Sequence, residues 1–342
     1  MIAAIPGWEA NTVEKLDDEK FIKRVEGLIN PMDVSSLLYL QTLKRVLPAP
    51  ILRRMLRRAS QRAPHVGFVI EPYSLFLFFR LRDLQLAGSL LPERYELSPA
   101  RIFADDEPEF YLGIGNLSTR ASTFWGIRQE SYLIARDKET GLLSWIFIDI
   151  LSNTIVALPT TGITDPNSRH AIFTTSSKGE VFLDISEDGT DRGLTLTGSI
   201  TGGKTRRLDE GLWVMGNTSI GHSKALSGGD DRPFAVIFDP AEVETGLDIP
   251  TGEIRITRNT LFPGLAEPEL RKVACFPFAQ HYIADSPGCH TPVKDRAEML
   301  TLYRLLSASD ALKTYSARTI EAQLLVGIAI TLLVAIGLVI VL

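Results

Sequence analysis

Residues 73–81 read YSLFLFFRL, an apolar and aromatic run whose only charged residue is Arg80. A run of this length without helical spacing is typical of a strand that is buried on both faces. Further short apolar or alternating runs follow it, separated by turns rich in Gly, Asp and Asn. They are residues 110–114, 131–135, 142–150, 154–158, 171–175, 180–185, 194–200, 212–215, 234–238 and 253–258. This pattern predicts a mainly β (α+β) domain, built as an antiparallel barrel or sandwich.

Helical spacing lies outside this β region, apart from one short helical stretch at residues 84–91. Leu37, Leu40, Leu43 and Leu47 recur at helical spacing before it, and residues 299–306 show the same spacing after it. The expected divisions are an N-terminal helical region (1–66), a β-barrel domain (67–290), a connecting helix (291–320) and a final segment (321–342).

The final segment is apolar throughout. Residues 322–342 read AQLLVGIAITLLVAIGLVIVL and contain no charge, and about 20 such residues are enough for a helix to cross a bilayer. A buried helix of a soluble protein normally keeps a polar stripe, which this segment lacks. We therefore expect a C-terminal transmembrane helix. Because residues 1–9 do not resemble a signal peptide, we expect a tail anchor with the body facing the cytoplasm.

A second membrane signal precedes the β domain. Residues 50–62 predict a helix with an apolar face of Leu52, Met55, Leu56 and Ala59. Its remaining surface is basic and includes Arg53, Arg54, Arg57 and Arg58. A basic amphipathic helix is typical of a membrane surface, although a solvated face over a packed apolar stripe explains the pattern equally well. We favour the membrane surface, so the expected partner is the lipid bilayer.

The composition excludes some functions. A net charge of −5 argues against nucleic-acid binding, which requires a basic stripe. The five histidines are scattered without ligand spacing, so no metal and no cofactor is expected. Cys275 and Cys289 are the only cysteines, and the sequence leaves open whether they pair.

Residues 198–205 read GSITGGKT and match the pattern of a phosphate-binding loop. Such a loop lies between a strand and a helix, but residues 206–215 contain Gly211 and no helical stripe. A glycine-rich hairpin turn is therefore the preferred interpretation, and a nucleotide hydrolase that uses Lys204 is a minor alternative.

A series of short motifs carries more information. In order, they are Arg80 in an apolar strand, a short helix with Leu91-Pro92, Glu130-Ser131-Tyr132-Leu133, a strand ending at Asp149, Ala157-Leu158-Pro159-Thr160-Thr161-Gly162, and residues 218–226. This order resembles the acetoacetate decarboxylase-like superfamily over residues 67–285. The stretch from Asp149 to Pro159 is shorter than the loop of that family.

The resemblance implies a closed β-barrel of acetoacetate decarboxylase-like type with a mostly apolar interior. In that family, a lysine after the proline forms a Schiff base with a keto acid. Thr160 and Thr161 stand at the two lysine positions here, and threonine cannot form an imine. Arg80 matches the arginine of the family's strand and is expected to bind a ligand, together with Glu130, Thr160 and Thr161. A surface or structural ion pair is an equally open alternative for Arg80.

We therefore expect a tail-anchored membrane protein whose decarboxylase-like barrel binds a small or amphiphilic ligand without Schiff-base lysine chemistry. A carboxylate is one option for the ligand. The sequence leaves open whether the barrel is an enzyme, and a lysine-independent lyase is the enzymatic option. The alternative is a non-catalytic membrane scaffold that docks a protein partner. A polar-lined cavity in the barrel would favour the first function, and a fully packed interior the second.

Overall fold

The computed structural model describes residues 64–121, 124–154, 156–158, 162–214, 217–222, 226, 232–286 and 289–308. Near the two ends it also describes residues 20, 22, 25, 47, 48, 50, 51, 54, 322, 325–329, 333 and 337. Most of the predicted N-terminal helices and most of the predicted anchor lie outside these residues. Within the described part of the chain, no helix combines the length and the apolar character needed to cross a membrane.

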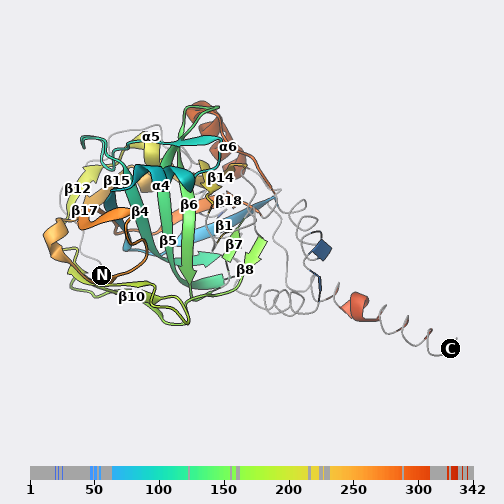
Figure 1. Cartoon of the computed structure of the whole chain (residues 1–342). Helices are drawn as coiled ribbons and strands as arrows, with labels where there is room; N and C mark the ends of the chain where they lie inside the picture. The colour runs from blue at the N-terminus through green and yellow to red at the C-terminus, as the bar shows by residue number, and fades with distance from the viewer. Residues whose placement is uncertain are drawn as a thin grey trace.

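Seven strands close into a barrel (Figure 1). Around the ring they are β4 (Tyr111–Ala121), β1 (His65–Ile70), β18 (Gln280–Asp285), β14 (Phe234–Phe238), β13 (Asn217–Ile220), β6 (Leu143–Ser152) and β5 (Phe124–Asp137), which pairs back onto β4. Neighbours in the ring run antiparallel except β13 and β6, which are parallel. The barrel is therefore mixed, and the prediction of an antiparallel barrel is wrong for this pair. Parallel neighbours need a long crossover connection, and residues 153–216 provide it.

The same sheet continues outside the ring to a total of twelve strands. From β4 it extends through β2 (Ser74–Leu81), β17 (Ala266–Phe276), β15 (Thr245–Asp248) and β12 (Lys204–Arg207), and β3 (Tyr95–Leu97) lies beside β5. β2, the strand predicted from residues 73–81, thus flanks the closed ring. β17 was not predicted, because Pro268 and several charges obscure its pattern and its pairing with β2 shifts register twice.

A separate four-stranded sheet, in the order β16-β11-β10-β9, packs against the outside of the barrel. Its strands are β9 (Ala171–Thr175), β10 (Glu180–Ser186), β11 (Gly193–Ser199) and β16 (Ile254–Asn259), and β7 (Val156–Leu158) pairs with β8 (Gly162–Thr164) elsewhere. No local pattern in these strands indicates that they form a sheet of their own.

The described helices between the strands are short. They are α4 (Leu84–Ser89), α5 (Glu210–Trp213), the 3₁₀ turns η2 (Pro240–Val243) and η3 (Thr251–Glu253), and α6 (Arg296–Ala308) after the last strand. Residues 212–215 were predicted as a strand, but Leu212 and Trp213 belong to α5. The side chain of Asp209 accepts a hydrogen bond from the Leu212 backbone N–H, and this N-cap begins the helix.

Alternation along β2 explains its unbroken apolar run. Leu75, Leu77 and Phe79 belong to the core shared with the four-stranded sheet, whereas Phe76 and Phe78 belong to the core inside the barrel. Because successive side chains of a strand point to opposite faces, a strand covered on both sides is apolar at nearly every position. β2 is such a strand up to its end, where Arg80 is exposed.

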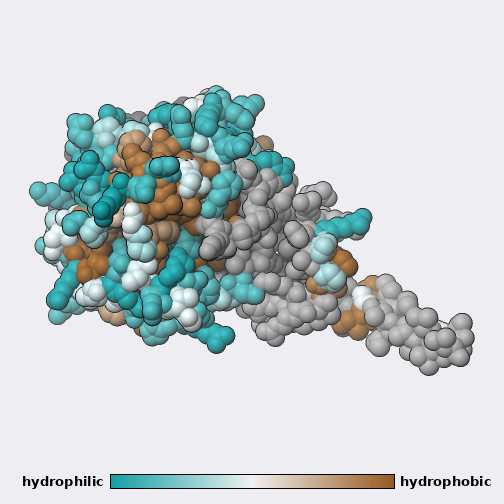
Figure 2. Space-filling model, in the orientation of Figure 1, coloured by the Kyte–Doolittle hydropathy of each residue, from teal (hydrophilic) through white to brown (hydrophobic). Residues whose placement is uncertain are grey.

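One helix and one surface area complete the description of the body. α6 covers the outer face of β14 and β18 with Met299, Tyr303 and Leu306. On another face, Leu84 and Leu86 of α4 are exposed at 44% and 45%. Figure 2 shows an apolar area within a mostly hydrophilic surface where Figure 1 draws α4 and β4.

Both cysteines are free thiols, so the pairing that the sequence left open is not formed.

Candidate functional site

The interior of the barrel holds a cavity of about 110 Å³. All seven strands of the ring contribute side chains to it, and β2 and α5 add Phe76, Leu212 and Trp213. Its lining consists of Phe68, Ile70, Phe76, Leu117, Arg128, Glu130, Tyr132, Trp145, Phe147, Leu212, Trp213, Asn217, Thr218, Phe234, Val236, Phe238, Tyr282, Ala284 and Asp285. Most of these residues are apolar or aromatic, and the polar ones are few. A mainly apolar cavity with a few placed polar groups is the usual form of a small-molecule site.

The most polar part of the lining comes from one strand. Arg128, Glu130 and Tyr132 alternate along β5 and therefore point to the same side, into the barrel. Arg128 Nη1 lies 3.4 Å from Glu130 Oε1, and the Tyr132 hydroxyl donates a hydrogen bond to Glu130 Oε2. All three residues are less than a tenth exposed. The cavity thus contains a buried ion pair with a phenol attached to its carboxylate.

Two phenols in the cavity remain protonated at neutral pH. Burial raises the pKa of Tyr132 well above its ordinary value, and the neighbouring Glu130 carboxylate raises this pKa further. Burial and Glu130 likewise raise the pKa of Tyr282. Both side chains therefore keep a hydroxyl proton that they can donate.

Asp285 also borders the cavity, but its oxygens are engaged by the protein. It accepts hydrogen bonds from the Thr291 hydroxyl at 2.6 Å, the Thr291 N–H at 2.8 Å and the Ala235 N–H at 2.9 Å. His65 Nδ1 lies 3.5 Å away. Burial alone would raise the pKa of this carboxyl, but the hydrogen bonds outweigh burial and the pKa is lowered. Asp285 is therefore an ionised structural group that ties β18 to β14 and to the segment after β18.

Arg80 and Glu130, the two charged residues that were expected to share the ligand site, lie apart in the structure. Glu130 lies in the cavity, whereas the Arg80 side chain is exposed near Glu109, with Nε 3.9 Å from Oε2, and does not line the cavity. The arginine that lines the cavity is Arg128 of β5, which was not among the site residues predicted from the sequence. The missed signal was the alternation of Arg128, Glu130 and Tyr132 in a strand with apolar flanks.

The other predicted site residues cannot be located at the cavity. Thr160 and Thr161 lie outside the described residues, as do Arg53, Arg57 and Arg58. Arg54 is described, and it is helical and exposed. Among the residues that the structure describes, no group of three His, Cys, Asp or Glu side chains could hold a metal ion.

The phosphate-like loop is followed by a strand. Gly198 and Ser199 end β11, a turn follows, and Lys204 begins β12 with an exposed side chain. The expectation of no helix in residues 206–215 is wrong, since α5 occupies residues 210–213. β12 nevertheless comes directly after the turn, so the loop has no helix N-terminus to face a phosphate. The expected hairpin is wrong, however, because β11 and β12 belong to different sheets.

Comparisons with known proteins identify similar folds only. No family model matches the sequence, and a search of curated proteins finds no match. The structure is similar to the crystal structure of acetoacetate decarboxylase from Legionella pneumophila, with 12% identity and a TM-score of 0.43, covering 67% of this chain and 87% of that one. It is also similar to the enduracididine biosynthesis enzyme MppR complexed with the condensation product of pyruvate and imidazole 4-carboxaldehyde. For that structure the identity is 10% and the TM-score 0.37, covering 66% of this chain and 87% of that one. The structural neighbours are thus acetoacetate decarboxylase-like folds at low identity.

Proposed function

We propose that this chain is a tail-anchored membrane protein whose barrel binds a small amphiphilic carboxylate without a Schiff-base lysine. The observation that supports the ligand is the cavity, in which an apolar lining meets one buried polar cluster, Arg128 with Glu130 and Tyr132. A fully packed interior would have favoured the scaffold alternative. The apolar segment 322–342 supports the tether.

The polar cluster suits a ligand with one anionic end. A guanidinium binds a carboxylate through parallel hydrogen bonds, which are stronger than neutral ones. Arg128 is less than a tenth exposed, so water screens its charge less than it would at the surface. The phenols of Tyr132 and Tyr282 are additional donors in the same cavity. At about 110 Å³ the cavity has the volume of roughly four water molecules, so the enclosed part of the ligand is small.

Two observations support chemistry without an imine. Thr160 and Thr161 stand where the resemblance asks for lysines, and none of the described residues that line the cavity is a lysine. Lys178 and Lys204 are exposed. A hydrated lysine keeps a pKa near 10.4 and is almost fully protonated at neutral pH, which makes it a poor nucleophile.

Substitution of Arg128 should weaken carboxylate binding. In the full chain reconstituted in lipid nanodiscs, Arg128→Gln should raise the Kd for hexanoate by about tenfold or more, because a hydrogen bond to a charged group is lost. Isothermal titration calorimetry measures this, with empty nanodiscs as the blank and circular dichroism as the check on folding. Arg80→Gln is the matched control, because it makes the same change at an exposed position outside the cavity, and it should leave the Kd unchanged.

The same samples give a second readout. After incubation with acetoacetate and sodium borohydride, mass spectrometry should find no covalent adduct on any lysine. A covalent adduct on a lysine would contradict the proposal that no imine forms. Weakened binding in Arg80→Gln but not in Arg128→Gln would show that the original expectation for Arg80 was right, and absence of binding in the wild-type chain would contradict the ligand proposal.

Removal of residues 322–342 should release the body from the membrane. The reason is that this segment alone is long and apolar enough to span the hydrocarbon core. Fractionation of cells that express the truncated chain should find it in the supernatant, in a folded form. Residual membrane binding that high salt removes would implicate the basic segment around Arg54, since surface attraction is screened by salt. Binding that survives a high-salt wash would contradict the tail anchor.

The scaffold alternative has one observation in its favour, the exposed leucines of α4. Leu84 and Leu86 form part of an apolar surface that a protein partner could cover. This function requires no ligand in the barrel. The hexanoate titration therefore separates the two proposals.

A further inference from the structure

Aromatic side chains line the cavity on two opposite walls. Around the ring, β18 lies opposite β5 and β6, with β1 and β14 on either side of it. On the β18 wall, Tyr282 stacks on Phe68 of β1, with ring centroids 4.8 Å apart and planes 4° apart. On the other side of Tyr282 lies Phe238 of β14, with its ring centroid 4.8 Å from that of Tyr282. These three rings form a continuous aromatic surface that faces the cavity.

The wall of β5 and β6 is aromatic as well. Tyr132 lies 4.5 Å from Phe147 and 5.1 Å from Trp145, measured between ring centroids. Trp213 of α5 continues this wall at 5.2 Å from Trp145. The two groups of rings thus lie on opposite sides of the ring of strands, and we call the cavity space between them the slot; the Arg128–Glu130 pair is among the lining residues.

The indole N–H groups do not face a ligand. Trp145 Nε1 donates to the Leu212 carbonyl at 3.0 Å, and Trp213 Nε1 donates to the Ile102 carbonyl at 2.9 Å. Both indoles are therefore fixed by the protein, and they offer only ring carbon to the cavity. An occupant of this part of the slot gains contacts with aromatic rings and no hydrogen bonds.

We propose that the cavity is selective for a small aromatic carboxylate, whose single planar ring lies between the two walls while its carboxylate meets Arg128. This inference rests on the proposed carboxylate-binding function and specifies the ligand class. Aromatic rings attract one another in offset and edge-to-face geometry beyond the effect of buried area, and a saturated ring of the same size lacks this term. An apolar cavity of about 150 Å³ holds benzene, so a cavity of about 110 Å³ limits the enclosed part of the ligand to one ring at most.

Three acids test the selectivity. Calorimetry on the full chain in lipid nanodiscs compares benzoate, cyclohexanecarboxylate and hexanoate, with empty nanodiscs as the blank. Benzoate should bind about tenfold more tightly than cyclohexanecarboxylate, because only its ring is planar and aromatic. Equal or tighter binding of cyclohexanecarboxylate overturns the aromatic selectivity and leaves the proposed carboxylate site standing. Absence of binding by all three acids overturns both.

One wall residue offers a matched pair of variants. Phe238→Leu removes a ring from the β18 wall, and it should abolish most of the preference for benzoate over cyclohexanecarboxylate, as measured by the ratio of their two Kd values. Phe278→Leu makes the same change at an exposed position, where the side chain is 52% accessible, and should keep the preference. A folded Phe238→Leu variant that retains the full preference overturns the placement of the ring in this slot. The comparison of acids on the wild-type chain decides the selectivity even if that variant does not fold.

Discussion

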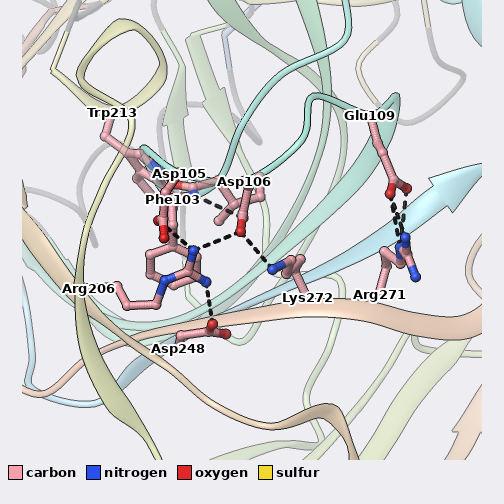
Figure 3. Close-up of polar contacts among 10 residues, drawn as sticks. Phe103, Asp105, Asp106, Glu109, Arg206, Trp213, Asp248, Arg271 and Lys272 are labelled. Carbon is pink, nitrogen blue, oxygen red and sulfur yellow. Dashed lines mark hydrogen bonds and ion pairs between the residues drawn. The ribbon is translucent and has the colours of Figure 1, made fainter.

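Replacement of Arg206 by methionine should lower the free energy of unfolding by about 2–4 kcal/mol, since it leaves buried and partly buried carboxylates without their cation. Arg206 of β12 donates to Asp248 of β15 and to Asp105 and Asp106 in the segment before β4, with Asp106 Oδ1 at 2.9 Å (Figure 3). Its guanidinium also lies 4.6 Å from the centroid of the Phe103 ring. One side chain thus connects three segments that are distant in the sequence.

The electrostatics support this expectation. Partial burial alone would lower the pKa of Arg206, but hydrogen bonds from its guanidinium to Asp105, Asp248 and Asp106 raise the pKa above its ordinary value. Lys272 Nζ also lies 2.8 Å from Asp106 Oδ1, so Asp106 keeps one cationic partner when Arg206 is replaced. The loss should therefore be partial, and the protein should still fold.

Urea unfolding at neutral pH measures the effect, and Figure 3 also contains the control. Arg271 of β17 makes a bidentate contact with Glu109, but its side chain is 56% exposed. Arg271→Met should cost less than about 1 kcal/mol, as exposed ion pairs usually do. Equal losses in Arg206→Met and Arg271→Met would show that the Arg206 cluster is no stronger than a surface pair.

Replacement of Asp285 by alanine should lower the free energy of unfolding by about 3–5 kcal/mol, because two backbone N–H groups and a hydroxyl lose their acceptor in a buried place. The N–H groups are those of Ala235 and Thr291, and the hydroxyl is that of Thr291. Asp285→Asn is the matched control. It keeps an oxygen that can accept from the N–H groups and should cost clearly less than the alanine variant.

The pH dependence gives an independent check on Asp285. Its pKa is lower in the folded protein than the ordinary value of about 3.9. Its contribution to stability is therefore fully present at neutral pH and is lost as the pH falls through the lowered pKa. The difference in unfolding free energy between the wild-type chain and Asp285→Ala should accordingly shrink in strong acid. A difference that is constant from neutral pH down to strong acid would contradict an ionised, hydrogen-bonded carboxylate.

Some of the strands that are covered on one or both faces were predictable from the sequence, but β1, β17 and β18 were not. Residues 171–175 and 234–238 coincide with β9 and β14, and residues 73–81 nearly coincide with β2. Their apolar pattern reflects contacts that recur along each strand, so it is visible locally. The division into a barrel and a second sheet depends on pairings between distant segments, and no local pattern specifies them.

The exposure of Arg80 has a physical reason of the same kind. Arg80 has the same parity on β2 as Phe76 and Phe78, which face the interior, so alternation alone suggests an inward side chain. It lies at the end of a strand outside the closed ring, however, and there the side chain reaches solvent. Arg128 was identifiable only with the knowledge that β5 belongs to the ring. Position along a strand and membership of the barrel thus decided which arginine enters the cavity.

The pairing of β1 with β18 determines when the cavity between the two aromatic walls can form. β1 begins the described body of the chain and β18 is its last strand, and the two pair along their full length from His65 with Asp285 to Ile70 with Gln280. During synthesis β1 therefore has no partner on this side until almost the whole domain has been translated, and contacts between segments so distant form slowly. The hairpin of β4 and β5, by contrast, pairs residues close in sequence and can form early. The wall that carries Tyr282 is the last to be added, so a nascent chain that ends before β18 lacks one of the two aromatic walls of the cavity.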